Sequence, residues 1–74
     1  MQQLKDIKAL GALIRQERKQ QGLTQEQLAS TCGVGIRFIR ELELGKETCH
    51  IGKAFLVVQL LGINIYTAKR GLPK

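Results

Sequence analysis

Apolar residues recur every three or four positions in the first twenty residues, the spacing of an amphipathic helix. This pattern predicts a helix from about Leu4 to Gln20, ended by Gly22. Arg18 falls on the apolar stripe, so its charge would face the core and needs a partner there. Gly11 costs the helix about 1 kcal/mol relative to alanine, which is tolerable in a long helix or useful if another helix approaches closely. The stripe consists of Leu4, Ile7, Leu10, Ile14 and Arg18.

Two shorter helices are predicted next, separated by a glycine turn. Thr24 is a good N-cap, and Gln27 three residues later completes a capping-box pattern. Gly33 can adopt the left-handed conformation that ends a helix, and the next helix closes at Gly45. Its inner side is marked by Ile39 and Leu42, and its opposite side by Ile36, Arg37, Arg40 and Glu41.

This arrangement is the helix-turn-helix geometry that places a recognition helix in the major groove of DNA. Outward arginines suit that role, because a guanidinium can make paired hydrogen bonds to guanine or hold a phosphate. The alternative is an ordinary helical hairpin whose arginines form a solvated face.

A fourth helix is predicted from about Ile51 to Leu61, and it is too apolar for only one face to be buried. Between its ends, the only polar residues of this predicted helix are Lys53 and Gln59. We therefore expect a second subunit to cover part of the helix surface. The residues expected to face inward, or nearly so, are Ile51, Ala54, Phe55, Val57, Val58 and Leu61, with Leu56 and Leu60 in addition.

The segment 63–67 alternates and is rich in β-branched and aromatic residues, which favours a strand. A lone strand is not stable, so we expect it to pair with its copy in a second chain. A short fifth helix or an irregular tail is the alternative. Residues 1–62 would then form the DNA-binding domain, and residues 63–74 a dimerisation strand and tail. The expected dimer contacts are Phe55, Leu60, Ile63 and Ile65.

Composition limits the function classes. The chain has 74 residues, enough for one domain. Its formal charge of +6 indicates a polyanionic partner, and nucleic acid is favoured over a membrane surface. Residues 1–13 lack the continuous apolar core of a signal peptide or spanning helix, so we expect a cytoplasmic protein. An enzyme is the least expected class, because there is one histidine and no phosphate-binding glycine loop.

Cys32 and Cys49 lack the spacing of a zinc site, so no metal or other cofactor is expected. Free, buried cysteines are the favoured interpretation. A redox switch is the alternative interpretation of these two cysteines.

Between about Leu10 and Gly62, the chain carries a series of short motifs that resemble, in the same order, those of the lambda-repressor (XRE, Cro/C1-type) helix-turn-helix family. This resemblance implies an all-α, four-helix DNA-binding fold. Within the family, the segment from Gly35 to Lys46 and the apolar tail are most similar to HipB-like antitoxins, which bind DNA and a HipA-type kinase toxin. The resemblance is carried by Arg18, Gly22-Leu23-Thr24-Gln25-Glu26, Leu28-Ala29, Gly33-Val34, Ile39 and Glu43-Leu44-Gly45-Lys46.

The resemblance also implies roles for individual residues. Arg18 would pair with Glu43, tying the first helix to the third. The strongest candidate for reading bases is Arg37, whereas Ile36 departs from the polar residue common at its position. The base-contacting set is Ile36, Arg37, Arg40 and Glu41, and the set that contacts or braces the phosphate backbone is Thr24, Gln25, Lys46 and Thr48.

Together these observations predict a homodimeric, sequence-specific repressor that binds a palindromic operator in double-stranded DNA. It is expected to be the autoregulating antitoxin of a HipBA-like operon, with a HipA-like toxin as a further partner and no membrane partner. The alternative is a protein-interaction module whose main role is to neutralise a toxin kinase.

Overall fold

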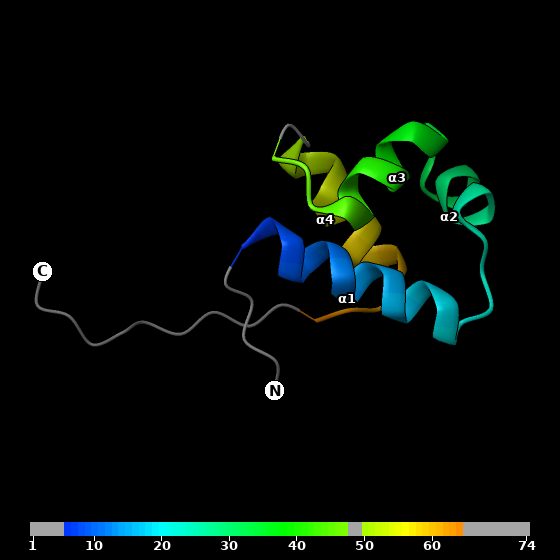
Figure 1. Ribbon diagram of the computed structural model, residues 1–74. Helices are drawn as coiled ribbons and strands as arrows, with labels where there is room; N and C mark the ends of the chain where they lie inside the picture. The colour runs from blue at the N-terminus through cyan, green and yellow to red at the C-terminus, as the bar shows by residue number, and fades with distance from the viewer. Residues whose placement is uncertain (1–5, 48–49, 65–74) are drawn as a thin grey trace, which may run out of the picture.

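A computed structural model describes residues 6–47 and 50–64, and all structural statements concern these residues. They form four α-helices joined by short connections, and no strand is found among them, which confirms the predicted all-α fold. In Figure 1, α1 runs along the base with α2 and α3 above it, and α4 passes behind α1. The helices are α1 (Ile7–Gln20), α2 (Gln25–Cys32), α3 (Ile36–Leu44) and α4 (Ile51–Leu60).

The first helix begins at Ile7, three residues later than the periodicity predicts. Asp6 has an extended backbone, and its side chain accepts a hydrogen bond of 3.0 Å from the backbone N–H of Ala9. This is an N-cap, which satisfies one of the free N–H groups of the first turn. The predicted start at Leu4 is therefore wrong, because Asp6 caps the helix instead of continuing it.

The predicted boundaries of α2 are confirmed. The Thr24 hydroxyl accepts from the Gln27 backbone N–H at 3.0 Å, and the Gln27 side chain accepts from the Thr24 N–H at 2.9 Å, which completes the capping box. Gly33 ends α2 with a φ of 70°, a conformation that side-chain-bearing residues rarely adopt. The chain turns there, and α3 packs against α2.

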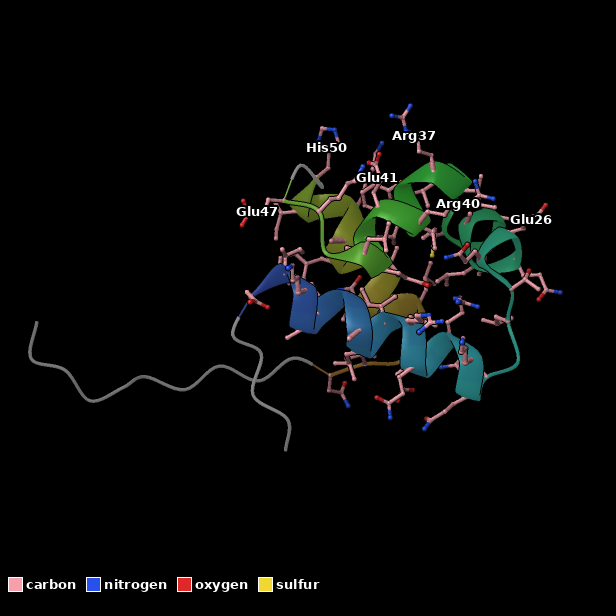
Figure 2. The ribbon with its side chains drawn as sticks, in the orientation of Figure 1. Glu26, Arg37, Arg40, Glu41, Glu47 and His50 are labelled. Carbon is pink, nitrogen blue, oxygen red and sulfur yellow. The ribbon has the colours of Figure 1, made fainter. Side chains whose placement is uncertain are left out.

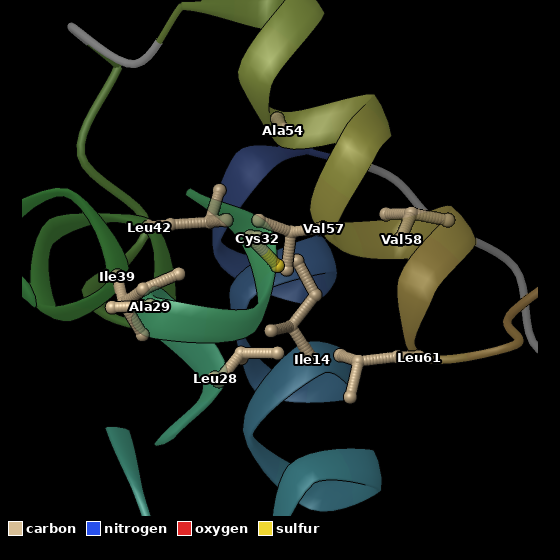
Figure 3. Close-up of a cluster of buried hydrophobic side chains, with 10 residues drawn as sticks. All are labelled: Ile14, Leu28, Ala29, Cys32, Ile39, Leu42, Ala54, Val57, Val58 and Leu61. Carbon is tan, nitrogen blue, oxygen red and sulfur yellow. The ribbon is translucent and has the colours of Figure 1, made fainter. Parts of the chain in front are cut away.

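One aliphatic core lies where the inner faces of the four helices meet (Figure 3). The predicted inward residues of α3 are fully enclosed in it, as is Ile14 of α1. Phe38 is half-buried against this core, with Lys53 of α4 5.9 Å from the centre of its ring. The buried apolar residues are Ile14, Leu28, Ala29, Cys32, Ile39, Leu42, Ala54, Val57, Val58 and Leu61.

The structure explains Gly11, because α3 approaches α1 closely at this residue. A Cβ atom on Gly11 would overlap the carbonyl oxygen of Leu42 and would lie 2.9 Å from that of Glu43. Both are backbone atoms and have little freedom to move aside. Glycine at this position therefore lets the two helices pack against each other.

The fourth helix buries a narrower arc than the sequence predicts. Ala54, Val57 and Val58 face inward, but Ile51 is 67% exposed and Phe55 48% exposed, so their predicted inward placement is wrong within one chain. At roughly 100° per residue, these two side chains fall outside the arc that the core occupies. Leu56 and Leu60 on the other edge are also exposed, so an apolar surface remains on α4.

The described residues contain only the start of the predicted C-terminal strand. Ile63 is half-buried against the core, and its N–H donates to the carbonyl oxygen of Val58, closing the end of α4. Neither Ile63 nor Asn64 belongs to a strand, and residues 65–67 lie outside the described residues. None of the helices within residues 6–47 and 50–64 is long and apolar enough to cross a membrane.

Candidate nucleic-acid interface

The exposed side of α3 carries most of the predicted base-contacting residues. Because Ile39 and Leu42 point into the core, the side chains on the other side of the helix face outward. Figure 2 shows Arg37 projecting away from the body of the protein, with Glu41 on the same side and Arg40 between α3 and α2. Ile36 is half-buried and packs against the core, so only part of its side chain can meet a ligand.

Arg37 is held in position by its own helix. Its Nε lies 3.2 Å from Oε2 of Glu41, one turn later, and its side chain is 89% exposed. Lys46 Nζ approaches the same carboxylate oxygen at 3.7 Å. Because this contact uses only Nε of Arg37, the two terminal nitrogens of the guanidinium face solvent. That paired set of donors suits the acceptor edge of guanine.

Beneath this surface lies the ion pair that the resemblance implies. Arg18 Nε donates to Glu43 Oε2 at 2.6 Å, and Arg18 Nη2 donates to Oε1 at 3.1 Å. The Arg18 side chain is 9% exposed and that of Glu43 is 3% exposed. Arg18 Nη1 also donates to the carbonyl oxygen of Leu23 at 2.8 Å. The guanidinium therefore joins α1 to α3 and to the loop before α2.

Two of the predicted phosphate-contacting residues are engaged within the protein. Gln25 Nε2 donates to Glu43 Oε1 at 3.1 Å, so this side chain braces the buried carboxylate from the first turn of α2. The Thr24 hydroxyl is used in the capping box. Lys46 is exposed beyond the end of α3, and Thr48 lies outside the described residues.

The contact residues predicted from the sequence leave out two residues at this surface. Arg15 of α1 and Leu44 of α3 line a hollow of about 360 Å³, and the other residues around it are Gln25, Arg40 and Glu43. Leu44 is 70% exposed, the largest exposed fraction among the large apolar side chains that the structure describes. It follows Arg40 by four residues and Arg37 by seven, a spacing that could have placed it on the same side of the helix.

The described thiol belongs to the core. Cys32 is a free, buried cysteine, as predicted, and burial raises the pKa of its thiol above the ordinary value. Cys49 lies outside the described residues. Within the part of the chain that the structure describes, no cluster of three or more His, Cys, Asp or Glu side chains is arranged to hold a metal ion.

A capped helix, a tight glycine turn and a second helix with cationic side chains outward define a helix-turn-helix domain, a class of DNA-binding regulator. Comparison with known families agrees: the helix-turn-helix family matches residues 14–66, and the chain belongs to this family. It is 54% identical over 56 residues to an uncharacterized HTH-type transcriptional regulator, y4mF, of Sinorhizobium fredii, with 76% of this chain and 74% of y4mF covered.

Solved structures give the fold independently. The chain superposes with a TM-score of 0.84 on a chain of the HipA-HipB-O2-O3 complex, at 21% identity and covering 95% of this chain and 99% of that one. A chain of the HipB-O4 20mer complex gives a TM-score of 0.83 at the same identity and coverage. The four helices therefore share the arrangement seen in these HipB complexes.

Proposed function

We propose that this DNA-binding regulator acts as a homodimeric, sequence-specific repressor of its own operon, as the antitoxin of a HipBA-like pair. The observation that carries the DNA-reading part is the outward guanidinium of Arg37, paired with Glu41 on a helix whose inner residues Ile39 and Leu42 are fully buried. The antitoxin part is supported by the similarity to HipB, which is named in complexes both with HipA and with a 20mer.

The surface of α3 would enter the major groove. Arg37 would donate to guanine O6 and N7, and Glu41 would accept from cytosine N4 or keep Arg37 in position. The exposed part of Ile36 would touch a thymine methyl group. The phosphate backbone would be met by Lys46, by Thr48 and by the free N–H groups at the start of α2, beside Thr24 and Gln25.

The exposed apolar residues on the two edges of α4 would be covered by a second copy of the chain. Phe55 and Leu60 are about half exposed, which is unusual for large apolar side chains without a partner. Ile63 would join this interface at the end of α4, with Ile65 in the predicted strand. Two recognition helices related by a two-fold axis would then enter successive major grooves about 34 Å apart, which requires a palindromic site.

A second candidate function is neutralisation of a toxin kinase, with DNA as an autoregulatory site only. The specific support is the fold shared with a chain of the HipA-HipB-O2-O3 complex. Toxin binding would use a surface away from α3, such as the outer side of α1. Co-purification from the native host tests it: a kinase that copurifies with wild-type protein and with the Arg37→Ala variant alike would support a separate toxin surface.

The DNA-reading role is tested by selecting bound duplexes from a random pool and measuring affinities for the selected site and for a random duplex. We expect Arg37→Ala to reduce discrimination between the two by about 1–3 kcal/mol, because a base contact is lost. Lys46→Ala is the control, and we expect it to weaken binding to both duplexes alike, because a phosphate contact carries no sequence information. Equal losses on both duplexes for Arg37→Ala would remove Arg37 as a base reader.

A further inference from the structure

The hollow beside α3 is bordered by two arginines from different helices. Arg15 comes from the outer side of α1 and Arg40 from α3, with Gln25 at the start of α2 and Leu44 completing the wall. Both arginines are exposed. Two helices, α1 and α3, thus each bring an arginine to one hollow at the surface.

The carboxylate in this hollow does not balance these charges. Glu43 also lines it, but both of its oxygens are already bonded, to Arg18 at 2.6 and 3.1 Å and to Gln25 at 3.1 Å. The Arg18 guanidinium offsets the single negative charge of Glu43. The hollow therefore keeps the positive charge of Arg15 and Arg40.

Arg37 and Arg40 differ in this respect. Arg37 is paired with Glu41, whereas within the described residues neither Arg40 nor Arg15 lies within ion-pair distance of a carboxylate. Like charges gathered on one concavity oppose each other, and an anion placed between them relieves that repulsion. A guanidinium pair is well suited to the tetrahedral oxygens of a phosphate.

We infer that Arg15 and Arg40 form a clamp for one phosphodiester of the DNA backbone, at the mouth of the hollow they share. This rests on the proposed DNA-binding function and assigns Arg40 to the backbone instead of to a base. Arg37 would read sequence, while the clamp would set how α1 and α3 sit against the strand. The apolar side chain of Leu44 would lie against the adjacent sugar.

The clamp is tested with the full-length protein on two duplexes, the selected site and a random sequence of the same length. We expect Arg15→Gln and Arg40→Gln each to weaken binding roughly tenfold on both duplexes, which is about 1.4 kcal/mol, because each removes one charge-assisted contact to the phosphate. Each should also reduce the slope of log affinity against log salt by about 1. The double variant should lose less than the product of the single losses, because both arms hold the same phosphate.

A scan with methylphosphonates, which neutralise one phosphate at a time, identifies the contact. Wild-type protein should lose affinity when the clamped phosphate of either half-site is replaced by a methylphosphonate. The affinity of the Arg15→Gln variant should not change on replacement at that position. Lys19→Gln is the matched control, since it removes one exposed positive charge from α1 outside the hollow. It should keep the wild-type loss at the clamped phosphate.

Three outcomes would overturn the clamp. If the protein binds duplex DNA but Arg15→Gln changes neither affinity nor salt slope, the clamp fails and the proposed function stands. If Arg40→Gln reduces discrimination between the duplexes, Arg40 reads a base and the clamp also fails. If the wild-type protein binds no duplex, the clamp and the proposed function fail together. Thermal melts show whether each variant remains folded. Because both arginines are exposed, we expect the variants to melt as the wild-type protein does.

Discussion

Arg18 links three parts of the domain through one guanidinium. It bonds to Glu43 of α3 and to the Leu23 carbonyl before α2, and Gln25 of α2 donates to the same carboxylate. A buried ion pair does not necessarily stabilise more than apolar residues of the same size, but it tolerates the loss of one partner poorly. Its structural effect is to hold the start of α2 and the end of α3 in a fixed relation. The proposed DNA surface depends on that relation.

At this scale we predict that Arg18→Ala lowers the free energy of unfolding by about 3–5 kcal/mol, because Glu43 would remain buried without its cation. Chemical denaturation measures the change. Arg37→Ala is the control: it removes an arginine from an exposed pair one turn apart, so we expect a loss of about 0.5 kcal/mol or less. Similar losses for the two variants would contradict the importance of the buried pair.

The packing of α1 on α3 is set by backbone contact, which a side-chain pattern does not reveal. Gly11 lies in the middle of α1, where glycine weakens a helix, yet it is buried beneath the end of α3. Gly45 makes a comparable close approach to Lys8 of α1. These two contacts let the last turn of α3 sit directly on α1, which brings Glu43 within reach of Arg18.

At the level of helix packing we predict that Gly11→Ala destabilises the protein by about 1–3 kcal/mol or more, although alanine is the better helix former. The added methyl group meets the backbone of α3, so the two helices must separate. The midpoint of urea denaturation measures this. Ala12→Gly at the exposed neighbouring position calibrates helix propensity alone, with an expected loss of about 1 kcal/mol. A stabilised Gly11→Ala variant would contradict the close approach.

The whole molecule leaves apolar surface uncovered along α4. Ile51, Phe55, Leu56 and Leu60 are all exposed, and they lie on both edges of the helix around its buried arc. A domain of 74 residues has a small core, and association adds buried apolar area that one chain lacks. The proposed dimer would bury these apolar side chains and would also bring two recognition helices together.

For the assembly we predict that Phe55→Glu converts the protein from dimer to monomer, because a charge would be buried in an apolar interface. Sedimentation over a range of protein concentrations measures the association. Ser30→Glu, which adds the same charge at an exposed position of α2, should leave the dimer intact. A monomeric wild-type protein at all concentrations, with unimpaired binding to a palindromic site, would exclude this interface.

Much of the fold was predictable because the governing signals are local. The capping box at Thr24, the left-handed Gly33 and the inward Ile39 and Leu42 follow from short-range spacing, and all are found in the structure. The predictions were wrong where helix capping or tertiary packing, and not local periodicity, determined the structure. Asp6 could have continued the first helix or capped it, and the exposed side of α4 could not be oriented from a segment that is apolar nearly all round.

The sequence by itself determined the four helices, their glycine stops and the side of α3 that faces outward, because hydrogen-bond geometry and apolar periodicity operate within a few residues. Only the tertiary structure decided that α1 touches α3 at Gly11, that Gln25 bonds to Glu43, and that Arg15 and Arg40 share one hollow. These contacts join residues distant in the chain, and their formation depends on the angles at which packed helices cross. No local pattern specifies those angles.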